Sequence, residues 1–582
     1  MHRDLTTLTD TSFDLLVIGG GMFGACAACD AAQRGLSVAI IERGDFAGAT
    51  SANSFKMVHG GIRYLQHGDV YRIRQSANER RVLLKIAPHL VRPLPIVIPT
   101  YGHGIKGKAA LRLGMGMYDL LTLDANRGIV DPARRIPWGR CISRHEVLAM
   151  FPGLERHRLT GAAIFCDGQI YNPPRLVLSF VQSAVEAGAV AANYVEAVGL
   201  LRDPGNPDRV VGVRARDVLG QNDLEIRAGV VLNAAGPYAE RLLQRAADTT
   251  LTLKGTYSRD ACFVVSRQLL DAEYAVALLG RTHDPDAVLS RGARHLFVVP
   301  WRNYTLLGVW HKVYRDDPDR FTVTDDELQR FIDEVNDAYP ALGLSLDDVA
   351  LWNAGLVPFG DNPDDAADLR YGHRSHLIDH AVAGSQVAGG VVENLITLIG
   401  VRLTTGRCEA VRAVDLAWRK LGHKPPRTRS AVTAVFGGRI DDFERYVQEA
   451  IAHRPQPQRI DEHVMRSLVH NYGSEYSRLL RYVEQEATMA ETIGASTTIK
   501  AQVRLAVRQE MAQTLADVVF RRTDLATGEY PGRDALRTCA ELMAADLYWN
   551  AGQIERQIER VAARFPRRVV AKRDYRPIAA AS

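Results

Sequence analysis

Three glycines near the N-terminus have the spacing that binds the diphosphate of a dinucleotide. Gly19, Gly21 and Gly24 form a G-x-G-x-x-G pattern. The first glycine of such a pattern permits a tight turn, the second lets a pyrophosphate approach the backbone, and the third lets a helix pack closely on a strand. Glu42 follows about 20 residues later, where a carboxylate bonds the ribose hydroxyls. These residues predict a dinucleotide cofactor.

The segments around the glycines have the patterns of the elements that must position them. Residues 13–18 are apolar and predict a buried parallel strand, residues 21–34 are rich in alanine and predict a helix, and residues 37–41 predict a second strand that ends on Glu42. This strand–helix–strand unit turns the N-terminus of its helix toward an anion.

Two further segments favour FAD over NAD. Residues 48–61 are rich in Gly, Ser and Thr and replace the next expected strand–helix pair, which suits a loop that wraps a cofactor. Residues 233–238 (Asn-Ala-Ala-Gly-Pro-Tyr) end a predicted strand in small residues and Gly236, as needed where backbone passes close to a bound dinucleotide. We therefore predict an FAD-dependent oxidoreductase.

The rest of the chain predicts an α/β fold with a second, α+β domain and a helical C-terminal region. Further strands are expected at 210–213, 230–236, 295–300 and 304–309, a helix at 325–338, and helical runs at 497–521 and 535–564. Lys424-Pro425-Pro426-Arg427 is the expected boundary. We expect an FAD-binding domain in residues 1–425, interleaved with a substrate domain (roughly 90–160 and 255–350), and a helical cap in residues 426–582.

Composition excludes several classes of protein. With 582 residues, 46% of them hydrophobic and 24% charged, the chain is an ordinary globular protein of two or three domains. A net charge of +5 is too dilute to indicate a nucleic-acid partner. Seven scattered cysteines favour a reducing compartment, and the Cys26–Cys29 pair is expected to pack inside the first helix. No segment predicts a membrane span, a signal peptide or a metal site, so a cytoplasmic protein is expected.

Longer runs of residues resemble a known family. Residues 54–65 (Ser-Phe-Lys-Met-Val-His-Gly-Gly-Ile-Arg-Tyr-Leu) and 83–90, together with the glycine pattern, look like the FAD-dependent glycerol-3-phosphate dehydrogenases. The His-Gly-Gly-x-Arg-Tyr element is specific to that family among flavoproteins. The resemblance covers nearly the whole chain. It continues at 233–237, 297–301, 403–405, 472–474 and 517–523, the last with the pair Arg521-Arg522.

The resemblance implies a fold and a reaction. The fold would be a Rossmann-like FAD-binding domain with an interleaved antiparallel-sheet substrate domain and a helical C-terminal domain. The flavin would accept hydride at N5 from a secondary alcohol, and the electrons would leave to a quinone or another acceptor. Thr50, Ser51 and Ser54 would line the flavin, and Leu403, Thr404 and Thr405 would lie near its pyrimidine end.

The substrate half of the chain departs from the family pattern. Val357 stands where the family has the arginine of Gly-Val-Arg-Pro, Trp310-His311 replaces the Thr-Asp of Gly-Thr-Thr-Asp, and Arg402 replaces the lysine of Gly-Gly-Lys-Leu-Thr-Thr. Lys254-Gly255-Thr256-Tyr257 replaces Lys-Gly-Ser-His. We therefore hypothesise a bulkier, more apolar pocket and a small polar, phosphorylated polyol-like substrate other than glycerol-3-phosphate itself. The expected substrate-binding residues are Lys56, Arg63, Tyr64, Tyr257 and Arg402.

Two histidines and an arginine are the candidates for catalysis. Oxidation of an alcohol needs a base for the hydroxyl proton, and His59 and His311 have the right residue type. Arg374 would hold a substrate oxygen or an anionic group. The alternatives are packing beside the flavin for His59 and a surface ion pair for Arg374. At the level of the whole protein, the alternatives are a flavin-dependent amine or alcohol oxidase with an unphosphorylated substrate, and a non-catalytic flavin-binding protein.

The C-terminal segment 560–573 is basic. It is either a solvated helix face or a peripheral membrane contact at the inner face of the membrane. A homodimer is a further expectation.

Overall fold

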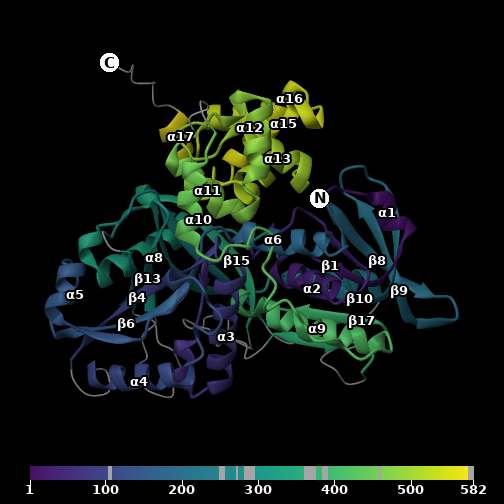
Figure 1. The fold of residues 1–582 in the computed structure, drawn as a ribbon. Helices are drawn as coiled ribbons and strands as arrows, with labels where there is room; N and C mark the ends of the chain where they lie inside the picture. The colour runs from purple at the N-terminus through teal and green to yellow at the C-terminus, as the bar shows by residue number, and fades with distance from the viewer. Residues whose placement is uncertain are drawn as a thin grey trace.

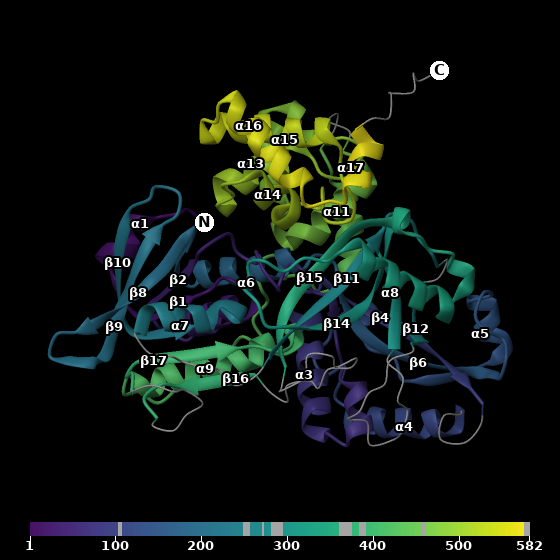
Figure 2. The same ribbon diagram turned by 180° about the vertical axis from the view of Figure 1, so that it is seen from behind.

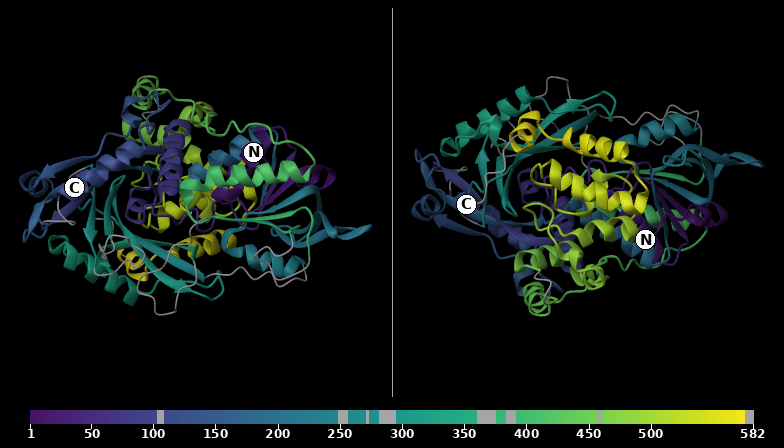
Figure 3. Two further views of the ribbon diagram at one scale, coloured as in Figure 1. Left: turned by 90° about the horizontal axis from the view of Figure 1, so that it is seen from below. Right: turned by 90° about the horizontal axis from the view of Figure 1, so that it is seen from above.

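The computed structural model describes residues 1–102, 108–247, 256–270, 273–280, 295–359, 375–382, 391–455 and 460–574. Two β-sheets lie side by side, and a helical C-terminal domain lies across both of them (Figures 1 and 2). Viewed from above, the C-terminal helices cover the junction of the two sheet-containing parts (Figure 3).

The first sheet carries the predicted strand–helix–strand unit. β1 (Ser12–Ile18) and β2 (Val38–Glu42) are parallel and flank α2 (Met22–Gln33) in the chain, which confirms the sequence prediction. The strand order is β16-β17-β10-β1-β2-β7, with β9 paired to β10 and β8 paired to β9. The other strands are β7 (Val190–Asn193), β8 (Val195–Asp203), β9 (Asn206–Asp217), β10 (Asp223–Asn233), β16 (His376–Asp379) and β17 (Leu395–Ile399).

Both faces of this sheet are covered, which explains why its central strand is a continuous apolar run. Leu15 and Val17 of β1 join one core cluster with α2, α6 (Pro173–Glu186) and α9 (Gly406–Lys420). The alternate residues, Leu16 and Ile18, join a second cluster with α1 (Leu5–Asp10), α7 (Ala239–Ala247), β8 and β9. Inside α2, Cys26 and Cys29 are buried and free, as predicted.

The second sheet has nine strands in the order β15-β11-β14-β13-β12-β4-β6-β3, with β5 paired to β6. All of its pairings are antiparallel except β4 with β12. α8 (Asp325–Ala338) has the bounds that the sequence predicts and begins at a capping box between Thr324 and Glu327. The strands are β3 (Met57–Val58), β4 (Val91–Tyr101), β5 (Arg140–Ser143), β6 (Leu159–Ile170), β11 (Thr256–Val265), β12 (Ala275–Leu279), β13 (His295–Trp301), β14 (Tyr304–Tyr314) and β15 (Val349–Phe359).

The C-terminal region is helical, as predicted. The two predicted helical runs, 497–521 and 535–564, are each interrupted. α13 (Lys500–Glu510) ends at Met511 and α15 (Arg533–Leu547) ends at Tyr548, both residues in the left-handed conformation. The other helices are α10 (Phe443–Ala452), α11 (Glu462–Tyr472), α12 (Ser477–Gln485), α14 (Leu515–Asp517), α16 (Ala551–Ala562) and α17 (Arg567–Asp574). None of the described helices is long and apolar enough to cross a membrane.

Substitution of Gly24 should disrupt the first βα turn. A Cβ atom on Gly24 would lie 1.9 Å from the carbonyl oxygen of Gly19. We expect Gly24→Ala to lower the free energy of unfolding by about 3 kcal/mol, because backbone must shift. Unfolding by denaturant and the FAD content of the purified protein measure the effect. Gly116→Ala, inside α4 (Lys108–Leu121) with open space around it, is the matched control and should be neutral or stabilising.

Candidate functional site

A large cavity runs between the two sheets and under the C-terminal domain. Its volume is about 1230 Å³, which exceeds the roughly 300–1,000 Å³ of ordinary small-molecule pockets and leaves room for a dinucleotide together with a substrate. The predicted site residues that line it are Gly19, Gly21, Glu42, Thr50, Ser51, Ser54, Lys56, His59, Arg63, Tyr64, Gly236, His311, Arg402, Leu403 and Thr404.

One end of the cavity has the features of a dinucleotide cradle. The carboxylate of Glu42 accepts hydrogen bonds from the N–H groups of Gly20 (2.7 Å) and Gly44 (2.9 Å). Burial raises the pKa of Glu42, and these two hydrogen bonds oppose that rise. Gly24 lies against Gly19 so closely that no side chain fits between them. The cradle therefore fits the diphosphate and ribose of FAD.

The glycine- and serine-rich loop folds back onto the start of α2. The hydroxyl of Ser51 accepts a hydrogen bond from the N–H of Met22 (3.0 Å), and the hydroxyl of Thr50 donates one to the carbonyl of Leu356 on β15 (3.1 Å). Further along, the N–H of His59 donates to the hydroxyl of Thr404 (3.1 Å). The loop thus connects the cradle to the substrate sheet and to the start of α9, where a flavin ring would be held.

His59 is oriented by a buried carboxylate. Its Nδ1 lies 3.1 Å from Oδ2 of Asp167, whose Oδ1 accepts hydrogen bonds from the N–H of Gly60 (2.6 Å) and from Arg80 (3.2 Å). Burial alone raises the pKa of Asp167, but the hydrogen bond with His59 and the charge of Arg80 hold this pKa below its usual value. An ionised Asp167 fixes the proton of His59 on Nδ1 and leaves Nε2 as a proton acceptor.

His311 forms a second histidine–carboxylate pair on two other strands of the same sheet. Its Nδ1 lies 2.6 Å from Oδ1 of Asp260, which faces it across the β11–β14 pairing, and the hydroxyl of Ser258 donates to the same carboxylate. His311 and Asp260 both line the cavity. The side chain of His311 is only 6% exposed, compared with 52% for His59, so His59 is the more accessible base.

Arginines and a tyrosine gather at the wall that follows the His-Gly-Gly element. The guanidinium groups of Arg72 (5.1 Å) and Arg402 (5.2 Å) both lie over the ring of Tyr64. Arg72 pairs with Asp69, whereas Arg402 donates to the hydroxyl of Ser76 (2.8 Å) and the amide oxygen of Gln75 (3.0 Å), which are neutral. Within the described part of the chain no ion pair neutralises Arg402, so its charge is available to an anion.

Lys56 is a buried cation that lines the same cavity. Its side chain lies over the ring of Trp301 (4.7 Å), the residue is 3% exposed, and its Nζ atom has no hydrogen-bond partner among the described residues. Burial lowers the pKa of Lys56 to about 8. An ammonium group in this position is available to a bound molecule and destabilises the protein without one.

Comparisons with known proteins agree with this geometry. The family model "FAD dependent oxidoreductase" matches residues 14–401, and the model "C-terminal domain of alpha-glycerophosphate oxidase" matches residues 429–554. The glycerol-3-phosphate dehydrogenase of Synechocystis sp. is 30% identical over 96% of this chain and 97% of its own length. The mitochondrial glycerol-3-phosphate dehydrogenase of Homo sapiens is 30% identical over 96% of this chain and 74% of its own length.

This chain belongs to the FAD-dependent glycerol-3-phosphate dehydrogenase family. It is an FAD-dependent dehydrogenase or oxidase. The solved structure of glycerol-3-phosphate dehydrogenase from Bacillus halodurans complexed with FAD has the same fold, with a TM-score of 0.72 and 24% identity over 99% of this chain and 98% of that one.

Four predicted positions of this family member lie outside the cavity lining or outside the described residues. Gly24 and Thr405 lie behind the cavity wall, where Gly24 packs on Gly19 and the hydroxyl of Thr405 donates to the carbonyl of Arg402 (3.2 Å). Tyr257 on β11 is not among the described lining residues, and burial is the main cause that raises its pKa. Arg374 lies outside the described residues.

Of the two departures from the family pattern that predicted a bulkier pocket, one lies at the cavity and the other does not. Val357 lines the cavity, as expected. The expectation that Trp310 makes the pocket bulkier is wrong, because its ring stacks on Phe331 (4.5 Å) and contacts Phe263 in the core on the other face of the sheet. Adjacent residues of a strand point to opposite faces, so His311 faces the cavity and Trp310 cannot.

Sequence reasoning did not identify the two carboxylates that hold the histidines. Asp167 stands inside β6, in the otherwise apolar run Ala-Ala-Ile-Phe-Cys-Asp, and Asp260 stands in β11 just before Ala-Cys-Phe-Val-Val. A lone acid within a buried strand is a signal that could have identified them, since such an acid needs a partner.

Replacement of Lys56 should stabilise the apoprotein at neutral pH. The folded protein releases this proton near pH 8, whereas the unfolded chain holds it to about pH 10.5, so stability rises with pH between these values. We expect Lys56→Met to raise the free energy of unfolding of the apoprotein at pH 7 by up to about 3 kcal/mol, and the gain to shrink toward pH 10.

Denaturant unfolding at pH 7 and pH 9.5 measures this difference. Lys312→Met is the control, because Lys312 is 61% exposed and pairs with Glu327. If Lys56→Met destabilises the apoprotein equally at both pH values, the charge of Lys56 is not the cause.

Proposed function

We propose that this enzyme oxidises the secondary alcohol of a small polyol phosphate of the glycerol-3-phosphate type. The observation that carries the proposal is the joining of three features in one cavity: the dinucleotide cradle at Glu42, a histidine base held by the ionised Asp167, and a cationic wall at Arg402. The relatives named above are glycerol-3-phosphate dehydrogenases, which supports the same class of substrate for this enzyme.

The cationic wall would bind the phosphate. Arg63 and Arg402 line the cavity beside Tyr64, and Lys56 offers an ammonium group with no hydrogen-bond partner among the described residues. A guanidinium group suits a phosphate because it donates two parallel hydrogen bonds. Since Trp310 does not narrow the pocket, the case for a substrate other than glycerol-3-phosphate now depends on Val357.

His59 would remove the hydroxyl proton through Nε2 while Asp167 holds its ring by Nδ1. FAD supplies the hydride acceptor when it is bound. Arg374 would hold the substrate oxygen. The His311–Asp260 pair is a second candidate base, because it has the same arrangement and also lines the cavity.

The partners of the enzyme other than its substrate stay predictions. They are the electron acceptor, which is a quinone or another oxidant, a homodimer, and a peripheral membrane contact through residues 560–573. One arginine of that segment, Arg568, pairs with Asp325 of α8 (3.1 Å), so the segment also serves as a contact between domains.

Anaerobic reduction of the bound flavin tests the substrate. We expect glycerol-3-phosphate or a related polyol phosphate to bleach the flavin, and unphosphorylated polyols and amino acids to leave it oxidised. Arg63→Ala should raise the KM for the phosphorylated substrate about tenfold or more, because it removes a charge-assisted contact. Bleaching by glycerol-3-phosphate itself would support the proposed oxidation of a polyol phosphate and rule out the narrower hypothesis that the substrate differs from glycerol-3-phosphate. Bleaching by an amine would overturn the proposal that the substrate is an alcohol.

Paired substitutions of the two carboxylates identify the base. Asp167→Asn should lower kcat about 100-fold or more, because the amide no longer fixes the proton of His59 on Nδ1. Asp260→Asn should change kcat less than tenfold. Stopped-flow reduction of the flavin measures both rates. The opposite order would assign the proton transfer to His311.

A further inference from the structure

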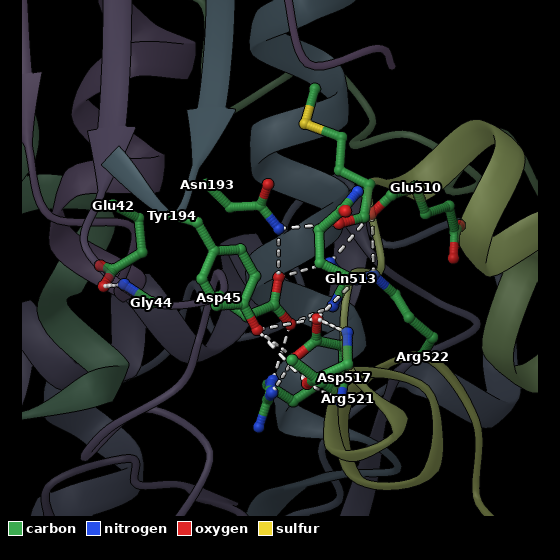
Figure 4. Close-up of polar contacts among 12 residues, drawn as sticks. Glu42, Gly44, Asp45, Asn193, Tyr194, Glu510, Gln513, Asp517, Arg521 and Arg522 are labelled. Carbon is green, nitrogen blue, oxygen red and sulfur yellow. Dashed lines mark hydrogen bonds and ion pairs between the residues drawn. The ribbon is translucent and has the colours of Figure 1, made fainter. Parts of the chain in front are cut away.

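The C-terminal domain binds the loop that follows Glu42, the acid expected to bind the ribose of FAD. Asp45 is fully buried, and its two carboxylate oxygens receive a forked pair of hydrogen bonds from Arg522 (2.7 and 2.8 Å) and a third from Arg521 (2.7 Å) (Figure 4). Both arginines belong to the π-helical turn Val518–Arg522 of the C-terminal domain. Asp45, which lies three residues after Glu42, therefore contacts Arg522, a residue 477 positions away in the chain.

The loop between Glu42 and Asp45 is short and is held by hydrogen bonds on both sides. The N–H of Gly44 donates to Oε1 of Glu42 (2.9 Å), and the carbonyl of Gly44 accepts from the N–H of Tyr194 (2.8 Å). On the far side of Asp45, the N–H of Ala47 donates to the carbonyl of Gly20 (2.9 Å). A displacement of Asp45 would therefore move both Glu42 and the glycine turn.

A second set of hydrogen bonds joins the end of β7 to the segments that precede this π-helical turn, at Asp517 of α14 and at Met511 after α13. The hydroxyl of Tyr194 lies 2.8 and 2.9 Å from the two oxygens of Asp517, and the side-chain amide of Asn193 donates to Asp45 (3.0 Å) and to the carbonyl of Met511 (2.8 Å). Arg521 also pairs with Asp517. Two arginines and two carboxylates make this network electrically neutral.

The C-terminal domain also forms part of the cavity wall. Ala516, Phe520 and Arg521 line the cavity on the side of Glu42 and Tyr194. A buried ionic network is a poor source of stability, because desolvation of its charges offsets their attraction. Hydrogen bonds between charged groups are directional, however, so this network fixes the conformation of the loop from Glu42 to Asp45.

We propose that Arg521 and Arg522 are positioning residues for FAD: acting through Asp45, they hold Glu42 and the first glycine turn in the shape that retains the adenosine half of the cofactor. The C-terminal domain is thereby a component of the cofactor site. This inference rests on FAD as the cofactor and is independent of the substrate proposed above.

Titration of the deflavinated protein with FAD and with FMN tests the proposal, since FMN lacks the adenosine half. We expect Asp45→Asn to raise the Kd for FAD about tenfold or more and Tyr194→Phe to raise it about threefold, with the Kd for FMN unchanged in both. Asp546→Asn is the matched control. It weakens the ion pairs that Asp546 forms with Arg504 (2.8 Å) and Arg508 (2.9 Å) inside the C-terminal domain, and it should leave both Kd values unchanged.

Circular dichroism before each titration confirms that the variant is folded. If Asp45→Asn does not fold, Tyr194→Phe decides, because it removes one hydroxyl group and keeps the ring. Unchanged FAD affinity in a folded variant would overturn the proposal. An equal loss of affinity for FAD and FMN would also overturn it, because the contact would then support the fold in general and not the adenosine half.

Discussion

The close contact of α2 with β1 is the constraint on which the remaining structure depends. Gly24 lies so near the carbonyl of Gly19 that the start of α2 is held against the end of the strand, and the turn between them exposes its backbone to the cavity. The carboxylate of Glu42 closes the turn by accepting a hydrogen bond from the N–H of Gly20. A helix N-terminus, a bare backbone and an acid therefore meet within one turn, which suits an anionic diphosphate joined to a ribose.

The loop that carries the proposed base is connected to this turn. The loop from Ser51 to His59 begins at the start of α2 and ends at the substrate sheet, so it sets the distance between the cradle and the base. Asp167 then fixes the ring of His59 from within β6. Because β6 pairs with β3, the strand that directly precedes His59, the base and its carboxylate are held by one sheet, and their spacing does not depend on how the domains meet.

The sequence predicted the parts that are local in the chain. The glycine pattern, the two strands beside it and the helix α8 follow from short-range periodicity and capping, and they are confirmed. The predicted domain boundaries stay a prediction. Contacts between distant residues were not predictable: Asp167 approaches His59 across 108 positions, and Asp45 approaches Arg522 across 477. The error at Trp310 has the same origin, since the face that a strand residue occupies depends on the register of the sheet.

Buried ion pairs join the parts of the molecule where apolar contact alone would permit sliding. Arg175 of α6 pairs with Glu510 of α13 (2.7 Å), and Arg407 of α9 pairs with Glu79 of α3 (Val70–Ile86) at 2.5 Å. Apolar side chains attract without direction, whereas a guanidinium fork accepts a carboxylate in few orientations. The apolar clusters therefore supply most of the stability, and these pairs fix how the helices and domains meet. A cavity whose walls come from two sheets and a third domain needs such fixed junctions, because a shift at any of them would separate the base, the cationic wall and the dinucleotide cradle.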